Sequence, residues 1–497
     1  MTLWSGFPRR SRRLSAATSA FRRRLLIAVS AVALALGTTA GLAAIAAPAS
    51  AASLPCDIYA AAGTPCVAAH STIRALYADY DGPLYQIERA SNDDTTDVYP
   101  LTTGGYADAA TQQSFCAGTS CTITEIFDQS GHGNNLTIEG SGANGKADVG
   151  ANAFALPVMA GGNLVYGVYV SPGVGYRDDD TTDVATGSDP EDEYMVTMAG
   201  HVNSGCCFDY GNAETDNSDN GDGHMSAINF STECWFSPCT GSGPWVQADL
   251  ENGLFSGGNG SNTANDGNDS TFVTAQVKTN GTSTYEIKGG NADSGSLSTW
   301  YSGSLPTTGS YIPLSQEGAI VLGTGGDDSN SSQGSFLEGV MLASEPSDTI
   351  DSEVQANIVS VGYSVPTKPQ TGVVVAGDDP SDCMDNNDAS ATDGNKVQMW
   401  ACDGNTGAQD WTLESNGTIQ IDGGCLDITG AKYTDGTLVE WWPCNSGANQ
   451  QWEAEDGELV NPTSGMCLDD PAFVTTDGTQ LDLWSCNGGD NQQWAVP

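Results

Sequence analysis

The chain has 497 residues, of which 62 are acidic and only 16 are Lys or Arg, and its formal net charge at pH 7 is −46. Nucleic acids, anionic membranes and polyanionic pectins repel a chain this acidic, which excludes them as partners and favours a neutral polymer such as a hemicellulose. The length predicts two domains.

Residues 1–51 predict a secretory signal peptide. They contain seven arginines and no acidic residue, and an apolar run extends from Leu25 to about Ala46. Small residues follow around Ala49 and Ala51, as at an A-x-A cleavage site. The alternative is an uncleaved membrane anchor, because the run is nearly long enough to span a bilayer. The cysteine-rich sequence that follows favours a secreted, extracellular protein without a membrane anchor.

Residues 52–364 predict an antiparallel β-sandwich. They are rich in Gly, Ser, Thr, Asn and Asp, and short alternating runs such as TFVTAQV and AIVLG are separated by turn residues. Many short strands at such spacing are typical of a sandwich. Amphipathic helices are few; residues 72–90 are one helical candidate, although turn and strand fit this segment too.

Fourteen cysteines in an exported chain predict disulfides. Short spacing pairs Cys56 with Cys66, Cys116 with Cys121, and Cys234 with Cys239. Cys206 and Cys207 are then left with each other, unless each pairs elsewhere. A disulfide prefers Cα atoms about 4.4–6.8 Å apart, whereas trans neighbours are about 3.8 Å apart, so this bridge closes a tight ring. Because strain tends to be kept at functional sites, the pair indicates a functional role.

The C-terminal region contains three repeats after a short Pro-containing linker at residues 365–372. Three cysteines of the region 373–497 are spaced 42 residues apart (Cys383, Cys425 and Cys467), as are three others (Cys402, Cys444 and Cys486). The repeats close on QDW, QQW and QQW, and units this short must pack together to bury a core. The pattern resembles the ricin-type β-trefoil lectin domain, also called a family 13 carbohydrate-binding module. The resemblance implies the disulfides Cys383–Cys402, Cys425–Cys444 and Cys467–Cys486.

This resemblance also implies a sugar site in each repeat, built from an Asp, a polar residue, an aromatic residue and an Asn. The second and third repeats contain Asp427, Glu440, Trp442 and Asn449, and Asp469, Asp482, Trp484 and Asn491. The first repeat contains Asp385, Gln398 and Trp400 but has Ala408 in place of Asn. We expect the aromatic faces to support sugar rings and the Asp residues to accept hydroxyl hydrogen bonds. The Q-x-W tryptophans are expected in the core.

Most reaction classes are excluded by missing motifs. The sequence has four histidines and no H-E-x-x-H, G-x-S-x-G, zinc, Walker or dinucleotide pattern. The acidic run 216–224 breaks the EF-hand spacing and reads as a solvated loop, as does the run 177–183. Carboxylates are abundant, and glycoside hydrolysis needs two, one ionised and one protonated. Asp249 and Glu251 share one face if they lie on a strand, and Asp327 follows two glycines.

Several words of residues 54–364 resemble glycoside hydrolase family 54, the secreted α-L-arabinofuranosidases. They include GCCFDYGNAET, DLENGLFSG, GGNADSGSLSTWYSG and EGAIVLGTGGDDSNSSQGSFLEGVM. The resemblance implies a jelly-roll-like β-sandwich and a reaction that retains the anomeric configuration. It implies Glu251 as the nucleophile and Asp327 as the acid/base, with Asp249, Asn252 and the backbone of Gly326 contacting the arabinofuranose.

The family resemblance also gives the two adjacent cysteines a role. It implies that the Cys206–Cys207 disulfide lies beneath the sugar ring as a flat floor, and that a tryptophan lines the pocket. Trp235 is the best candidate, although the surrounding Cys234–Cys239 loop departs from the family pattern. The ricin-type repeats are a second departure, because fungal members usually carry an arabinose-binding trefoil of another type.

Together these patterns predict a monomeric, exported exo-glycosidase that removes α-L-arabinofuranosyl groups from arabinoxylan or arabinan. A trefoil would hold it on plant cell-wall polysaccharide, and no metal or organic cofactor is implied. One alternative keeps the enzyme class but acts on β-xylosides or galactofuranosides. Another is a carbohydrate-binding protein that no longer catalyses, against which the presence of both Glu251 and Asp327 argues.

Overall fold

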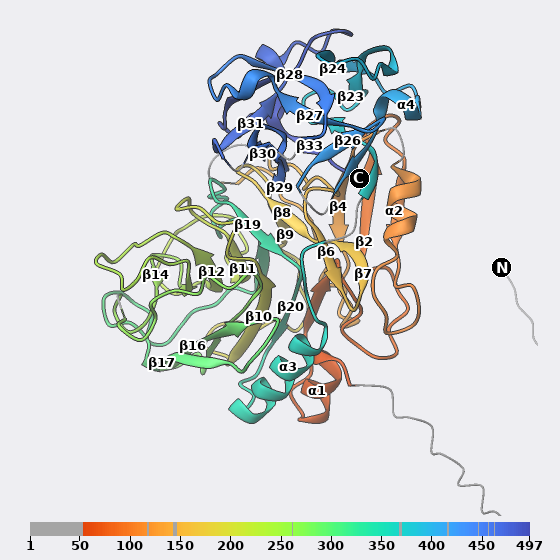
Figure 1. Cartoon of the computed structure of the whole chain (residues 1–497). Coiled ribbons are helices and arrows are strands. Elements are labelled where there is room, and N and C mark those ends of the chain that lie inside the picture. The colour runs from red at the N-terminus through yellow and green to blue at the C-terminus, as the bar shows by residue number, and fades with distance from the viewer. Residues whose placement is uncertain are drawn as a thin grey trace, which may run out of the picture. The chain divides into compact units, whose positions relative to one another are not determined.

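The computed structural model describes residues 53–497 except 117–118, 143–146, 261, 367–369, 415–416, 446, 456 and 462. The predicted signal peptide and part of the predicted linker lie outside the described residues. Antiparallel strands dominate what is described (Figure 1), which confirms the predicted all-β class. Within the described part of the chain, the helices are too short or too polar to cross a lipid bilayer.

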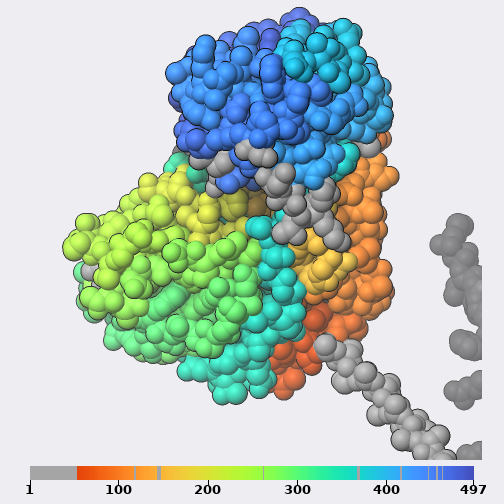
Figure 2. Space-filling view, viewed as in Figure 1, coloured from red at the N-terminus to blue at the C-terminus, as the bar shows by residue number. Residues whose placement is uncertain are grey.

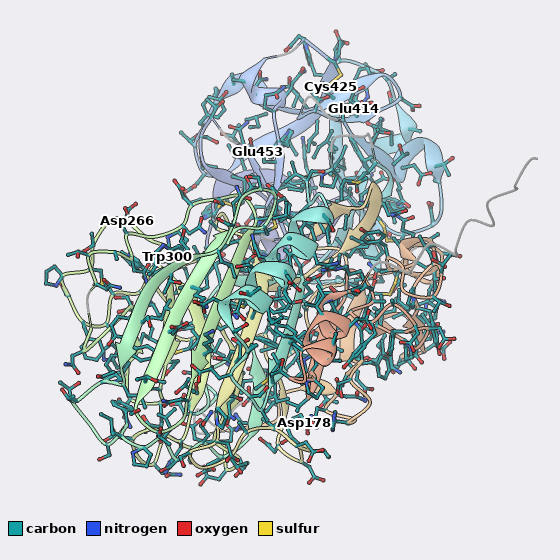
Figure 3. The ribbon with its side chains drawn as sticks, turned by 90° about the horizontal axis from the view of Figure 1, so that it is seen from below. Asp178, Asp266, Trp300, Glu414, Cys425 and Glu453 are labelled. Atoms are coloured by element: carbon teal, nitrogen blue, oxygen red, sulfur yellow. A yellow bond between two sulfur atoms is a disulfide. The ribbon has the colours of Figure 1, made fainter. Side chains whose placement is uncertain are left out.

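One layer of the N-terminal domain is a six-stranded sheet in the order β1-β20-β10-β15-β16-β17. These strands are β1 (Ala68–Ser71), β20 (Glu338–Leu342), β10 (Glu191–Thr197), β15 (Val273–Thr279), β16 (Thr284–Asn291) and β17 (Ser298–Ser304). Figure 3 shows its long strands next to one another, with Trp300 on the edge strand β17. Helix α3 (Asp348–Ser360) is tied to this sheet, because Lys278 and Lys288 donate to Asp351 at 2.9 and 2.7 Å. Helix α1 (Pro55–Ala61) lies beside α3 (Figure 1).

The other layer is a ten-stranded sheet in the order β14-β13-β12-β11-β18-β9-β5-β4-β2-β3. Its strands are β14 (Leu254–Phe255), β13 (Trp245–Asp249), β12 (Ser226–Ser231), β11 (Asp209–Ala213), β18 (Ala319–Leu322), β9 (Tyr176–Asp178), β5 (Leu136–Ile138), β4 (Cys121–Ile126), β2 (Tyr85–Arg89) and β3 (Thr95–Val98). The remaining elements are helix α2 (Ala109–Phe115) and the pairs β6 (Pro157–Ala160) with β7 (Asn163–Tyr166) and β8 (Val168–Val170) with β19 (Gly334–Phe336). Side chains of both large sheets, among them Tyr194, Val277, Ile228 and Phe230, share one buried core, as expected of a sandwich.

The helix considered for residues 72–90 is wrong, and the turn-and-strand alternative is correct. Only β2 (Tyr85–Arg89) is regular in this segment. Residues 72–76 are all buried, so they lack the exposed face that a helix of this kind would show. Pro83 interrupts the remainder.

The C-terminal domain is one network of thirteen strands. Its strands are β21 (Gln370–Val373), β22 (Val375–Ala376), β23 (Asp382–Asn386), β24 (Asn395–Ala401), β25 (Asp410–Leu413), β26 (Ile419–Ile421), β27 (Gly424–Ile428), β28 (Thr437–Pro443), β29 (Glu453–Glu455), β30 (Glu458–Asn461), β31 (Met466–Asp469), β32 (Asp482–Ser485) and β33 (Trp494–Ala495). Its short helices are α4 (Thr406–Gln409), η1 (Asn387–Ala389), η2 (Thr429–Ala431), η3 (Ala448–Gln450), η4 (Pro471–Phe473) and η5 (Asp490–Gln492). Figure 2 shows these residues, coloured blue, as one compact lobe. Residues 370–372 of the predicted linker belong to β21, which pairs with β25, so the domain begins before residue 373.

The Q-x-W tryptophans lie in the core of this domain, as the repeat pattern predicts. Trp411, Trp452 and Trp494 are each at most 3% exposed. Their indole N–H groups donate to the carbonyl oxygens of Met384, Leu426 and Leu468 at 2.9, 3.0 and 3.0 Å. The same bond therefore recurs in each repeat, which ties the end of the repeat to the strand that carries its first cysteine (β23, β27 or β31).

A buried ion pair joins the segment that follows β1 to strand β20 of the six-stranded sheet. The guanidinium of Arg74 donates to Glu338 Oε1 at 2.7 Å, and the hydroxyl of Tyr363 donates to Oε2 at 2.9 Å. Glu338→Ala would leave the buried cation of Arg74 without its partner, so we expect the free energy of unfolding to fall by about 3–5 kcal/mol. Chemical denaturation measures this, with Glu353→Ala on the exposed face of α3 as the control. An equal loss in the two variants would contradict the prediction.

Candidate active site

A cavity of about 190 Å³ lies beside strands β11 to β14 of the ten-stranded sheet. Its lining consists of Cys206, Cys207, Glu214, Asp219, Met225, Trp235, Asp249, Glu251, Gly253, Leu254, Gly325, Gly326, Asp327 and Ser329. Seven of the eight site residues predicted for this domain are therefore brought together. The eighth, Asn252, is exposed and lies outside the lining, where its side chain hydrogen bonds to Asp219.

The carboxylate of Glu251 is held by backbone N–H groups of the loop 216–224. The N–H groups of Asn220 and Gly221 donate to Oε1 at 3.0 and 2.8 Å, and that of His224 donates to Oε2 at 3.0 Å. Hydrogen bonds of this kind stabilise the ionised form of a carboxylate. The loop was predicted to be merely solvated, and its role was missed because sequence patterns do not show where backbone donors point.

Asp327 lies in a tight loop and is only partly buried. Its Oδ1 accepts a hydrogen bond from the N–H of Ser329 at 3.1 Å, and Gly325 N–H donates to the carbonyl of Ser329 at 2.9 Å. Gly326 has no room for a side chain, because a Cβ there would overlap the carboxyl of Glu214. Asp327 and Glu251 are both partly buried residues, and the side chain of Glu251 is itself inaccessible to solvent.

The predicted pair Cys206–Cys207 is a disulfide across a cis peptide bond. The Cys207 N–H donates to the carbonyl of Ser329, and the Ser331 N–H donates to the carbonyl of Cys206, both at 3.0 Å. These bonds join the disulfide to the loop that carries Asp327. The other six predicted disulfides are also present in the structure.

Trp235 lies at the rim of the cavity and is 50% exposed. The disulfide Cys234–Cys239 closes its loop. The next residue, Phe236, stacks on Phe255 of β14 with ring centroids 4.7 Å apart, which anchors the loop to the sheet. An aromatic face held rigidly at the rim is suited to contact a sugar.

Three further carboxyls lie near Glu251 and Asp327 in the cavity lining. Burial raises the pKa of Glu214 to about 8, and Asp249 and Glu251 add to this by charge repulsion. Burial also raises the pKa of Asp249, and it raises the pKa of the more exposed Asp219 as well. Glu214 and Asp219 were not predicted, because nothing in their local sequence separates them from the other acidic residues.

Arg177 of β9 hydrogen bonds to two backbone carbonyls of the cavity lining. Its guanidinium donates to the carbonyl of Gly326 at 2.9 Å, to the carbonyl of Glu214, and to the carboxylate of Glu139 at 3.4 Å. The sequence run 177–183 was predicted to be a solvated loop, but Arg177 itself is buried. It therefore connects the Asp327 loop to the end of β11.

Among the described residues, three groups of possible metal ligands come within 4.8 Å of one another. Two of them contain cysteines that are already in disulfides. The third consists of Glu139, Asp148 and Asp328, behind the Asp327 loop, and burial raises the pKa values of Glu139 and Asp148 to about 8 and about 6. Protonation can relieve the charge of this cluster without a metal ion.

The trefoil presents one exposed tryptophan in each repeat. Trp400, Trp442 and Trp484 are 37%, 37% and 41% exposed, in contrast to the buried Q-x-W tryptophans. The antiparallel register places Asp385 opposite Gln398, Asp427 opposite Glu440, and Asp469 opposite Asp482. In each repeat the polar and the aromatic residue therefore lie on one strand, and the Asp lies on the strand paired with it.

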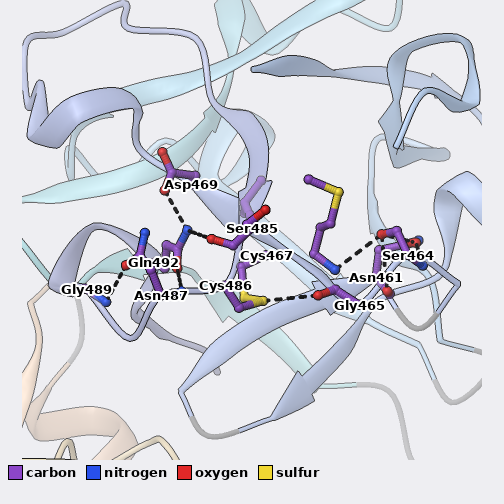
Figure 4. The surroundings of a disulfide bond; sticks show 12 residues. Asn461, Ser464, Gly465, Cys467, Asp469, Ser485, Cys486, Asn487, Gly489 and Gln492 are labelled. Carbon is purple, nitrogen blue, oxygen red and sulfur yellow. Dashed lines mark hydrogen bonds between the residues drawn. A yellow bond between two sulfur atoms is a disulfide. The ribbon is translucent and has the colours of Figure 1, made fainter. Parts of the chain in front are cut away.

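The Asp of each repeat is oriented by amide groups of the same repeat. In the third repeat the amides of Asn491 and Gln492 both donate to Oδ1 of Asp469, at 2.9 and 2.8 Å (the bond from Gln492 is drawn in Figure 4). Figure 4 also shows the nearby disulfide Cys467–Cys486. In the second repeat Asn449 and Gln450 donate to the two oxygens of Asp427 at 2.9 and 2.8 Å.

The first repeat differs from the other two. Ala408 is buried where they have Asn, and the amide of Gln398 donates instead to Asp385 Oδ1 at 2.9 Å. Gln409 donates to Oδ2 at 3.3 Å. Both oxygens of this Asp therefore accept bonds within the domain, and Gln398 replaces the carboxylate of the other repeats. In the labelled view of Figure 3, Glu414, Cys425 and Glu453 mark the trefoil.

Comparison with known proteins identifies both domains. Residues 55–364 match the family model described as "Alpha-L-arabinofuranosidase B, catalytic", and residues 371–494 match the ricin-type beta-trefoil lectin domain. Alpha-L-arabinofuranosidase B of Aspergillus oryzae and the probable enzyme of Aspergillus terreus are 52% and 53% identical over 318 residues, which are 63% of this chain and 62% of theirs. The chain thus spans less than two thirds of the length of these curated relatives.

Two solved structures are similar over more of the chain. They are a family 54 α-L-arabinofuranosidase soaked with a cyclic sulfate inhibitor and an arabinofuranosidase complexed with arabinofuranosyl-α-1,2-xylobiose. Each is 34% identical with a TM-score of 0.65, and the match covers 89% of this chain and 98% of the other. The predicted resemblances of both domains are confirmed.

The raised pKa of Glu214, about 8, predicts a measurable effect on stability. Between its ordinary value and this pKa the folded chain holds a proton that the unfolded chain releases, so the free energy of unfolding falls as the pH rises through this range. Glu214→Gln cannot ionise, and we expect its stability to fall less than that of the unmodified protein between pH 5 and 8. Denaturation at several pH values measures the difference, and Asp216→Asn in the exposed neighbouring loop is the control. Parallel curves for Glu214→Gln and the unmodified protein would contradict the prediction.

Proposed function

Since the chain belongs to the family of α-L-arabinofuranosidase B catalytic domains, we propose that it hydrolyses terminal α-L-arabinofuranosides with retention of configuration. The observation that carries the proposal is that Glu251 and Asp327 line one small cavity together with the Cys206–Cys207 disulfide. A volume of 190 Å³ is well below the roughly 300–1,000 Å³ of pockets for drug-sized ligands, which favours a single sugar unit. An exo-acting enzyme needs such a site.

The geometry supports a division of labour between the two carboxyls. Glu251, with its negative charge stabilised by three backbone N–H groups, attacks the anomeric carbon and forms a glycosyl-enzyme. Asp327, partly open to solvent, protonates the departing oxygen and then takes a proton from the water that releases the sugar. The disulfide beside the Asp327 loop offers the sugar ring an apolar floor.

The substrate and setting are also part of the proposal. The solved relative bound to arabinofuranosyl-xylobiose supports arabinoxylan as a substrate, with arabinan as the other candidate. The exposed tryptophans of the trefoil support retention on the polysaccharide. The signal-like composition of residues 1–51 supports secretion. Assays with chromogenic arabinofuranoside, xyloside and galactofuranoside compare the proposed activity with its alternatives, and preference for either of the latter two would overturn it.

Replacing the two catalytic carboxyls is expected to have different effects. Glu251→Ala abolishes formation of the glycosyl-enzyme, and added azide gives a product of inverted configuration. Asp327→Ala slows polysaccharide cleavage by about 10²–10⁴-fold, the usual contribution of general acid/base catalysis. With a 4-nitrophenyl substrate its first step survives, because that leaving group needs little protonation.

Product configuration by NMR, azide rescue and burst kinetics check these outcomes. Glu233→Ala, near Trp235 but outside the cavity lining, is the control. Direct release of β-arabinose by the unmodified protein would contradict the retaining assignment.

The trefoil is expected to bind through its second and third repeats. Trp442→Ala combined with Trp484→Ala removes two exposed aromatic platforms, so retention on insoluble polysaccharide falls sharply while turnover of a small substrate is kept. A pull-down assay on arabinoxylan measures this. Trp400→Ala is the matched control, and loss of binding in that variant alone would reverse the ranking of the sites.

A further inference from the structure

A buried carboxyl outside the lining of the cavity, Asp209 of β11, has one oxygen that lacks a donor. Its side chain is inaccessible to solvent. Oδ1 accepts a hydrogen bond from the amide of Asn229 at 2.7 Å, but Oδ2 has no hydrogen-bond donor among the described residues. Asn229 is itself oriented, because its Oδ1 accepts from the hydroxyl of Ser231 at 2.7 Å. A buried carboxylate oxygen without a donor is costly, so a proton is needed at Oδ2.

The sheet brings Asp209 into contact with Asp249. The register pairs Asp209 with Asn229 and Ala227 with Asp249, so all four side chains are on one face of β11, β12 and β13. Ala227 is small and lies between the two acids, which leaves room for their carboxyls to meet above it. The two carboxyls are within hydrogen-bonding contact of each other. A hydrogen bond between two carboxyls requires that one of them be protonated.

Asp249 connects this pair to the nucleophile. Its Oδ1 accepts a hydrogen bond from the backbone N–H of Glu251 at 3.0 Å. Glu251 has a φ of +83°, a left-handed conformation that is unusual for a residue with a side chain. This hydrogen bond to Asp249 therefore helps to hold the backbone of Glu251 in an unfavourable conformation. That conformation directs the Glu251 carboxylate toward the loop 216–224.

We propose that Asp209 and Asp249 share a single proton, and that Asp209 acts through Asp249 as a positioning residue for Glu251. Ser231 and Asn229 set the direction of these hydrogen bonds. Ser231 donates to Asn229, and Asn229 donates to Asp209. The proton is carried by Asp249 and donated to Oδ2 of Asp209, which leaves Oδ1 of Asp249 as the acceptor for Glu251. Removal of the shared proton places two adjacent buried negative charges beneath the site, and their repulsion separates Asp249 from the backbone that it supports.

The electrostatic surroundings agree with this arrangement. Burial raises the pKa of Asp209 to about 7, and burial together with the charge of Asp209 raises the pKa of Asp249 well above its ordinary value. The other titratable groups that face the pair are Glu193 on β10, Glu214 after β11, Glu251 and Asp327 in the loops, and Tyr311. These groups are acids or a phenol, and any negative charge on them opposes ionisation of the pair.

The experiment compares the pH dependence of kcat/KM with 4-nitrophenyl α-L-arabinofuranoside, and this readout rests on the proposed function. With this substrate the first step needs little help from Asp327, so its ionisation does not define the alkaline limb. Asp209→Asn keeps the acceptor for Asn229 and supplies a permanent donor to Asp249. We expect kcat/KM at the pH optimum to fall by less than about tenfold. We also expect the alkaline limb of the pH profile to shift to higher pH by about one unit or more.

Two further variants separate positioning from simple structural support. Asp209→Ala leaves both Asn229 and Asp249 without a partner and is expected to lower kcat/KM by at least about tenfold at every pH. Glu353→Gln, on the exposed face of α3, removes one negative charge and is expected to leave the limb in place. An unmoved limb in Asp209→Asn, or equal losses in Asp209→Asn and Asp209→Ala, would overturn the inference.

A second measurement does not depend on the activity. Asp side-chain ¹³C resonances, assigned by their loss in Asp209→Asn and Asp249→Asn, should show two carboxyls that hold one proton between them at neutral pH. Both carboxyls ionised at pH 7 would overturn the shared proton. If the unmodified protein failed to hydrolyse the arabinofuranoside while the resonances showed the shared proton, the proposed function would fail and the proton assignment would stand.

Discussion

The side chain of Glu251 is inaccessible to solvent, and three backbone N–H groups donate to its carboxylate. His224 Nδ1, at 3.5 Å, is the one basic side chain paired with it among the described residues. The loop 216–224 therefore has to hold one conformation, and the left-handed backbone of Glu251 has to be kept in place by Asp249. The Cys206–Cys207 disulfide and the Asp327 loop are in turn joined by backbone hydrogen bonds of Ser329 and Ser331. The cavity depends on this set of backbone bonds more than on ion pairs.

Much of this arrangement could be predicted from short sequence motifs. The resemblance found Glu251, Asp327 and the adjacent cysteines because their neighbours form distinctive motifs. Asn252 was expected to contact the sugar and lies outside the cavity lining, because a motif gives sequence adjacency and adjacent side chains can point in different directions. Glu214 and Asp209 were missed because burial decides the behaviour of a carboxyl, and burial depends on which strands become neighbours.

Secondary structure, too, was predictable where it depends on local sequence and was not predictable where it depends on packing. The alternating runs predicted strands correctly, since a period of two is a local property. Residues 72–90 contain enough apolar residues for a helix, but residues 72–76 are buried on every side, and this burial is set by the tertiary packing. In the trefoil the ricin-type resemblance implied the three disulfides, and the recurring Q-x-W motif predicted the buried tryptophans. In the first repeat Gln398 makes the contact that Asn makes in the other two repeats. The sequence did not predict this, because the donor comes from a different position in the repeat.

Under the proposed function, the three exposed tryptophans of the trefoil also affect how long the protein stays on a polysaccharide. Each belongs to a different repeat, so one polysaccharide chain or neighbouring chains can occupy more than one site at a time. Release of one site then leaves the domain tethered by another, and rebinding occurs at the high effective concentration of a linked ligand. Sites that are individually weak can in this way give a long residence on the polymer while each single contact is exchanged quickly. A catalytic domain linked to such a module can sample many side chains before it diffuses away.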